Sequence, residues 1–210
     1  MNAMLRPAFV VLTLVLTAGP VLAQAPPPDQ NAWSISASAY TFIVPDDRDV
    51  VQPTLAADRG WLHLAARYNY EDVETGSVWF GYNFGGGKTL GWTVTPMIGG
   101  VVGTTAGVAP GWTFSLSYWK LELASESEYV IDARNTSESF FYNWSELSIS
   151  PVDWLRAGAV VQRTRVYQSD RDVQRGLFVG VTYKIVDVAA YVFNPDDSKP
   201  IVVLAASVGF

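Results

Sequence analysis

The sequence predicts an all-β chain whose antiparallel strands close into an up-and-down barrel. Apolar and polar side chains alternate with a period of two in window after window, which is typical of half-buried strands. None of these windows carries an apolar stripe at helical spacing. Short clusters rich in Gly, Pro, Asn and Asp separate the windows and predict reversals of the chain. With 49% hydrophobic and 16% charged residues, the 210-residue chain is too apolar to be a disordered protein.

Twelve segments alternate strongly enough to be expected as strands. The first sets the pattern, because Ser36, Ser38 and Tyr40 share one phase while Ile35 and Ala37 share the other. The expected strands are residues 32–44, 50–57, 61–70, 77–84, 89–102, 108–119, 121–133, 140–149, 155–167, 176–184, 187–194 and 200–210. Pro53 weakens the second strand, and the reversals near Lys120 and near Val186 are the least marked. Removing that strand together with one of these reversals would leave ten strands.

The first 23 residues read as a secretory signal peptide. Arg6 precedes an apolar run from Pro7 to Leu16, and Ala23 supplies the small residue that signal peptidase needs. A transmembrane anchor is the alternative, but the run is about half of the ~20 residues that a spanning helix requires. Residues 24–31 are then expected to be an extended leader, and residues 32–210 the barrel domain.

The alternation is compatible with two kinds of barrel, which differ in whether the apolar face meets the core or the lipid. A soluble sandwich or lipocalin-like barrel turns its apolar face inward, whereas a transmembrane barrel turns it outward to lipid. Two features favour lipid. Many expected strands reach the ~9–11 residues of a tilted membrane strand, against ~5–6 in globular proteins. Aromatic residues also occupy the apolar phase near strand ends, as at a membrane–water interface. They are Tyr68, Tyr70, Phe84, Trp112, Tyr118, Phe141, Tyr183 and Phe210.

The last segment adds a third feature. Residues 202–210 (VVLAASVGF) put Phe210 at the end of an alternating apolar stripe. This pattern resembles the C-terminal assembly signature of bacterial outer-membrane β-barrel proteins. The resemblance implies a Gram-negative outer-membrane location, contact with outer-membrane lipid and lipopolysaccharide, and recognition by the barrel-assembly machinery through the strand ending at Phe210. Residues 140–147 and 162–165 are similar to an uncharacterised group of such barrels, to which no activity is attached.

With the apolar phase assigned to lipid, the polar phase should line the lumen. Arg163 and Arg165 are expected to point inward or to sit above the bilayer, because lipid-facing charge costs roughly 2–4 kcal/mol near the midplane. The candidate lumen residues are Arg67, Asn69, Glu122, Glu126, Glu128, Asp132, Tyr142, Glu146, Arg163 and Arg165. Their arginines and carboxylates fit two interpretations, a cross-linked structural network or a tight path that selects solutes.

If both termini face the periplasm, most acidic loops lie outside. The outer set is Asp46, Asp47, Asp49, Glu71, Asp72, Glu74, Asp170, Asp172, Asp196 and Asp197, while the inner turns hold Arg59, Lys88, Lys120 and Lys184. The acidic rim serves solubility, or it gathers divalent cations that bridge lipopolysaccharide.

Several functions are excluded or disfavoured. The absence of Cys excludes a disulfide scaffold, thiol catalysis and Cys-ligated metals, and the net charge of -6 argues against nucleic acid as a partner. Outer-membrane lipases pair a His with a Ser two residues on, but the single His63 is followed at that spacing by Ala65. We therefore expect no enzyme and no cofactor.

The leading hypothesis is a narrow, porin-like channel for passive diffusion of small solutes or ions, monomeric by default. The alternative is a non-conducting structural or surface barrel that binds lipopolysaccharide or a partner.

Overall fold

The fold was analysed in a computed structural model, which describes residues 32–165 and 173–210. The predicted signal peptide and leader lie outside the described residues. All twelve predicted strands are present with shifted bounds; the one predicted at 77–84 is divided into two segments, and residues 166–167 of the one predicted at 155–167 lie outside the described residues. The strands are β1 (Ser34–Ile43), β2 (Val50–Arg59), β3 (Leu62–Tyr68), β4 (Thr75–Tyr82), β5 (Phe84–Gly86), β6 (Leu90–Gly103), β7 (Gly107–Tyr118), β8 (Leu121–Asp132), β9 (Phe140–Val152), β10 (Leu155–Arg163), β11 (Gln174–Tyr183), β12 (Val186–Phe193) and β13 (Ile201–Gly209). One short 3-10 helix, η1 (Thr136–Glu138), precedes β9.

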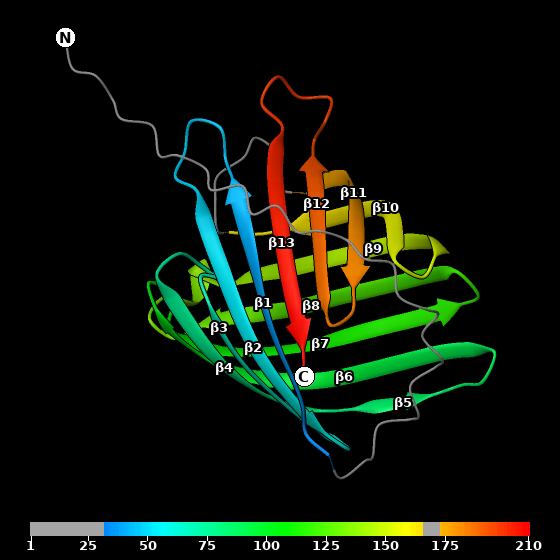
Figure 1. Ribbon diagram of the computed structural model, residues 1–210. Helices are drawn as coiled ribbons and strands as arrows, with labels where there is room; N and C mark the ends of the chain where they lie inside the picture. The colour runs from blue at the N-terminus through cyan, green and yellow to red at the C-terminus, as the bar shows by residue number, and fades with distance from the viewer. Residues whose placement is uncertain (1–31, 166–172) are drawn as a thin grey trace.

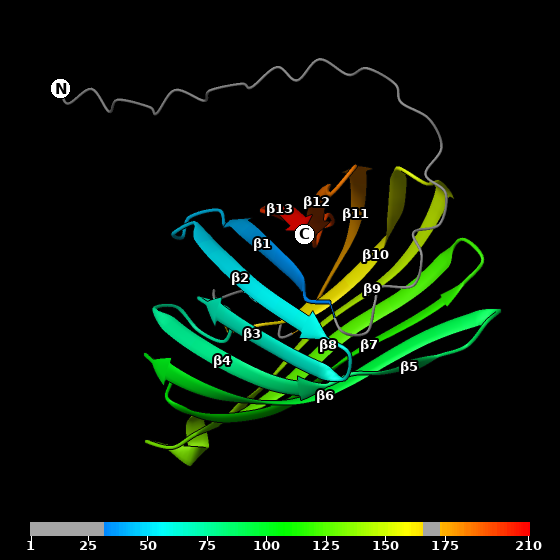
Figure 2. The same ribbon diagram turned by 60° about the horizontal axis from the view of Figure 1, so that its bottom comes forward.

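The strands form one closed antiparallel sheet. β1 pairs with β13, so the first and last strands lie side by side (Figure 1). β4 pairs with β6, and the short β5 pairs with β6 farther along. The pairs Gly81–Met97 and Phe84–Val94 fall in the same register, so β4 and β5 act as one strand interrupted at Asn83. The described residues therefore form a twelve-stranded barrel, whose wall curves continuously round its interior (Figure 2).

The two ends of the barrel differ. At the end that holds Ser34 and Phe210, here called the terminal end, tight turns at 60–61, 119–120, 153–154 and 184–185 join the strands. At the other end, the loop end, longer connections span 44–49, 69–74, 133–139 and 194–200. This asymmetry is typical of outer-membrane barrels, which have short periplasmic turns and longer extracellular loops. Pro53 lies just beyond the last pair of the β2–β3 ladder, where a missing N–H is tolerated.

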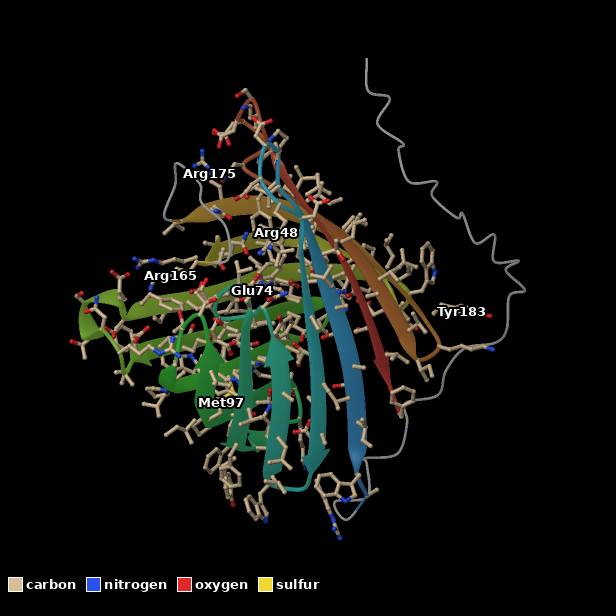
Figure 3. All side chains as sticks on the ribbon, turned by 90° about the vertical axis from the view of Figure 1, so that its left-hand side faces the viewer. Arg48, Glu74, Met97, Arg165, Arg175 and Tyr183 are labelled. Carbon is tan, nitrogen blue, oxygen red and sulfur yellow. The ribbon has the colours of Figure 1, made fainter. Side chains whose placement is uncertain are left out.

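The apolar phase faces outward, as the sequence predicts. Val102, Leu177 and Leu204 are 69%, 63% and 48% exposed, and large apolar side chains cover most of the outer wall. Tyr183 projects away from the barrel near the terminal end, whereas Arg165 and Arg175 lie toward the loop end (Figure 3). Within residues 32–165 and 173–210, no helix is long and apolar enough to span a membrane.

The interior is not uniformly polar, which corrects one expectation. Its loop-end half holds two apolar clusters. The first comes from β1, β2 and β10–β13 and centres on Phe42, Tyr191 and Phe193; the second comes from β3, β4 and β6–β8 and includes Trp79 and Val130. Several inward positions near the loop end of these strands carry Val, Ile or Phe, although Thr75 and Ser77 of β4 are also buried there. The terminal end instead opens into a cavity of about 1120 Å³.

Candidate functional site

An ion pair joins two strands of the barrel that are not neighbours in the sheet. Arg67 on β3 contacts Glu126 and Glu128 on β8, although β4, β6 and β7 lie between these strands in the sheet. Arg67 Nη2 lies 2.6 Å from Glu126 Oε1, and Nη1 donates to Glu128 Oε2 at 3.1 Å. The Arg67 and Glu128 side chains are 4% and 0% exposed, and that of Glu126 is 22% exposed. This buried bridge fixes the distance between the two walls.

Aromatic rings enclose the guanidinium. It lies 4.5 Å from the ring centre of Tyr70 and 4.6 Å from that of Trp79, within the range of cation–π attraction. Tyr142 on β9 donates its hydroxyl to the Tyr70 hydroxyl at 3.0 Å. Farther round the wall, Trp144 packs edge-on against Tyr40 of β1, with ring centres 5.5 Å apart. We call this layer of ion pair and aromatic rings the constriction.

The loop 69–74 folds into the lumen and supplies part of the constriction. Asn69 adopts a left-handed backbone conformation (φ 57°), which an Asn tolerates, and its Oδ1 accepts from Glu74 N at 2.7 Å. The turn directs Tyr70 inward, whereas the sequence placed Tyr70 on the lipid face. It also buries Glu71 completely, whereas the sequence placed Glu71 on an outer rim. A strand-period pattern cannot anticipate this reversal at Asn69.

Glu71 is held by neutral donors inside the barrel. Its Oε1 accepts from Ser77 Oγ at 2.5 Å and from Trp79 Nε1 at 3.2 Å, while its Oε2 is buried without a hydrogen-bond partner. Burial raises the pKa of Glu71, and the charge of Arg67 opposes that rise. Glu128 is the other charged group that interacts with Glu71. The constriction thus places three carboxyl groups round one guanidinium.

A second ion-pair network lies closer to the terminal end. Arg156 on β10 donates to Asp187 Oδ1 at 2.7 Å and to Glu146 Oε2 at 3.3 Å. Glu146 Oε1 also accepts from Trp144 Nε1 at 2.8 Å and from the Tyr191 hydroxyl at 2.9 Å. Two carboxylates surround Arg156, so neither arginine of the described lumen offers an uncompensated positive charge.

The cavity at the terminal end contains the single histidine. His63 Nδ1 lies 2.8 Å from Asp58 Oδ1, and Asn83 Nδ2 donates to the same oxygen at 2.8 Å. Thr95 Oγ1 in turn donates to Asn83 Oδ1 at 2.7 Å. Among the described residues, no serine hydroxyl is hydrogen-bonded to His63, and no three His, Asp or Glu side chains are arranged to hold a metal. These hydrogen bonds link the polar side chains that line one side of the cavity.

The remaining predicted lumen residues are spread along the barrel. Glu122 has the inward phase but lies near the terminal end, away from the constriction. Asp132 lies at the loop end, where its Oδ1 accepts from the backbone N–H groups of Arg134 and Asn135. Asn69 lies in the loop after β3. Arg163 ends β10 in the outward phase, exposed at the loop end.

Arg165 lies above the strands and does not line the constriction. Its Nη2 donates to Glu138 Oε2 at 2.6 Å, and its guanidinium lies 4.9 Å from the Phe140 ring centre. Of the ten residues that the sequence selected, the structure brings Arg67, Glu126, Glu128 and Tyr142 together, with Glu146 in the neighbouring network. The sequence analysis did not select Glu71, Arg156 or Asp187. Arg156 could have been selected from the sequence, because it lies in the inward phase of β10.

Some of the loop-end charges pair with one another. Arg48 Nη1 lies 3.8 Å from Glu74 Oε1, and the two residues are labelled close together in Figure 3. Arg175 Nη2 lies 3.1 Å from Asp196 Oδ2. Lys199 pairs with Asp46, whose hydrogen bond and charge raise the pKa of Lys199. Three of the predicted rim acids, Asp46, Glu74 and Asp196, thus lie beside a basic side chain, while Asp170 and Asp172 lie outside the described residues.

Comparison with solved structures settles the class of fold. The KdgM porin superposes with a TM-score of 0.53 and 8% identity, over 83% of this chain and 99% of that chain. The chain has a porin-like outer-membrane barrel fold. The KdgM porin in complex with disordered oligogalacturonate gives a TM-score of 0.53, with 9% identity over 84% of this chain and 99% of that one. For the outer membrane protein Omp33 of Acinetobacter baumannii the TM-score is 0.45, with 11% identity over 85% of this chain and 97% of that one.

The likeness lies in the fold of this porin-like barrel, because no family model and no curated protein sequence matches the chain.

Proposed function

We propose that the protein is a narrow outer-membrane channel for passive diffusion of small neutral and cationic solutes. The observation that carries the proposal is the charge balance of the lumen. Glu126 and Glu128 flank Arg67, and Glu146 and Asp187 flank Arg156. A surplus of carboxylates along a low-dielectric path attracts cations and repels anions. The porin-like fold and the wide cavity at the terminal end support passage over catalysis.

The proposed preference for cations and neutral solutes differs from the anion preference that binding of oligogalacturonate would require. That ligand is a polyanion, and it is bound by the KdgM porin of the comparison. An anion path requires arginine or lysine side chains that are free to contact carboxylates. Both arginines of the described lumen layers are held by carboxylates of the same chain.

Planar bilayer recordings test the proposal. The folded protein should show discrete conductance, and its reversal potential in a KCl gradient should indicate K⁺ preference. Glu126→Gln should move the reversal potential toward zero, because Glu126 is the constriction carboxylate with the greater exposure. Asp132→Asn is the matched control, since this carboxyl group serves the loop-end turn. Anion preference, or equal shifts in both variants, would contradict the proposed role of the constriction.

A non-conducting barrel is the second candidate, and the apolar clusters in the loop-end half of the lumen favour it. In that case the outer loops would carry the function by binding lipopolysaccharide or a protein partner. Absence of conductance in a sample shown to be folded would select this candidate. Pairing of Asp46, Glu74 and Asp196 with basic side chains reduces the charge available for bridging cations.

A further inference from the structure

A pocket within the constriction is lined by a side chain whose polar group has no partner. The pocket has a volume of about 160 Å³ and is bounded by β1, β2, β3, β8 and β9. Gln52 of β2 lines it, and the side chain is 2% exposed with its Nε2 donor unsatisfied. A buried donor without a partner costs about 1–3 kcal/mol, so a native site normally provides an acceptor for it. The pocket therefore calls for an occupant that accepts a hydrogen bond from Gln52.

The same pocket offers an acceptor and aromatic surfaces. The carboxylate of Glu126 lines it, as do the rings of Tyr40, Tyr142 and Trp144. An occupant that satisfies these groups must accept from Gln52, donate to Glu126 and present apolar C–H surface to the rings. Hydroxyl groups both donate and accept, and the carbon skeleton of a polyol or sugar ring supplies the apolar surface.

Two other small solutes fit less well. An anion would be repelled by Glu126, which lines the pocket and already neutralises the charge of Arg67. A methylated ammonium ion cannot accept a hydrogen bond from Gln52, and Arg67 already occupies the ring face of Tyr70 at 4.5 Å. Water alone would place about five molecules in this volume at ~30 Å³ each, and it remains the competing occupant in the test.

We propose that the constriction pocket binds one neutral, hydroxyl-rich solute the size of a single sugar ring. The proposal names the solute class of the channel proposed above and rests on that function for its physiological meaning. Binding is, however, a property of the pocket itself, so it can be measured without any current through the channel.

Equilibrium binding to the folded full chain in detergent tests the proposal, with glucose, glucuronate and tetramethylammonium as probes. Glucose titration should change tryptophan fluorescence through Trp144 and should give saturable heat in calorimetry. Glucuronate, which differs by one carboxylate, and tetramethylammonium should bind at least tenfold more weakly. Gln52→Leu should weaken glucose binding about fivefold, the worth of one hydrogen bond.

A pair of serine variants separates loss of the pocket from a general effect on the barrel. Ser38→Leu fills the pocket from β1 and should abolish binding, whereas Ser36→Leu, two residues away in the same inward phase, should leave it unchanged. Folding of each variant is checked by circular dichroism. Absence of glucose binding to the folded protein, equal binding of glucuronate, or equal loss in the two serine variants would overturn the inference. Glucose binding without conductance would overturn the proposed channel and leave the pocket assigned.

Discussion

Removing the guanidinium of Arg67 should destabilise the barrel more than any single change at the rim. In Arg67→Met, Glu128 would stay in the lumen at 0% exposure with no countercharge, and Glu126 would lose its partner 2.6 Å away. Breaking one side of a buried ion pair costs about 3–5 kcal/mol. Because Glu126 is 22% exposed and partly solvated, we expect the lower end, about 3 kcal/mol.

The assay is reversible urea unfolding in lipid vesicles. Arg175→Met is the control, because its ion pair with Asp196 is 70% and 49% exposed and should contribute at most about 1 kcal/mol. The double variant Arg67→Met with Glu128→Gln should recover part of the loss, since no unpaired charge would remain at position 128. Additive effects of the two changes, or a loss in Arg67→Met no larger than in Arg175→Met, would refute the cross-lumen bridge.

Three further changes probe other parts of the barrel. Gly99→Ala should cost about 1–3 kcal/mol in urea unfolding, because a Cβ there would lie 2.6 Å from the Trp79 ring, whereas Gly100→Ala, with open space, should cost nothing measurable. Val179→Arg on the outer wall of β11 should cost roughly 2–4 kcal/mol in vesicles, and unchanged stability would contradict a lipid-facing wall. The raised pKa of Glu71 means that the protonated form favours the inward loop. That stabilisation is complete below the ordinary pKa of ~4.3 and is lost as the pH rises through the raised pKa. Protease cleavage within residues 69–74 should therefore increase with pH, and Glu71→Gln should show a flat profile relative to wild type.

The wall of the barrel could be predicted because a strand repeats every two residues. That period placed Leu177 and Leu204 outside, and the turns at 60–61 and 153–154 follow predicted clusters, while those at 119–120 and 184–185 lie at the two least marked reversals. Even Pro53 was consistent with a strand, since it lies just past the ladder with β3. Local patterning is sufficient here because each residue's environment is decided by its phase alone.

The lumen was less predictable because its contacts join strands that are far apart in the sheet. The strand period marked Arg67 and Glu128 separately as inward-facing. Their pairing depends on which strands approach each other across the lumen, and no local pattern encodes that. Glu71 was placed on the wrong side because one left-handed residue, Asn69, turns the loop inward. Asp132 shares the phase of Glu128 and yet caps a turn, because the strand ends there.

The pairing of β1 with β13 has a consequence for biogenesis. These strands are separated by nearly the whole length of the chain, so the seam cannot form until the final segment has been made and delivered. Every earlier species carries two unprotected edges with unsatisfied amide and carbonyl groups, which invite aggregation outside a chaperoned route. Deleting residues 201–209 would leave β1 and β12 permanently open, a lesion more severe than the loss of any side chain.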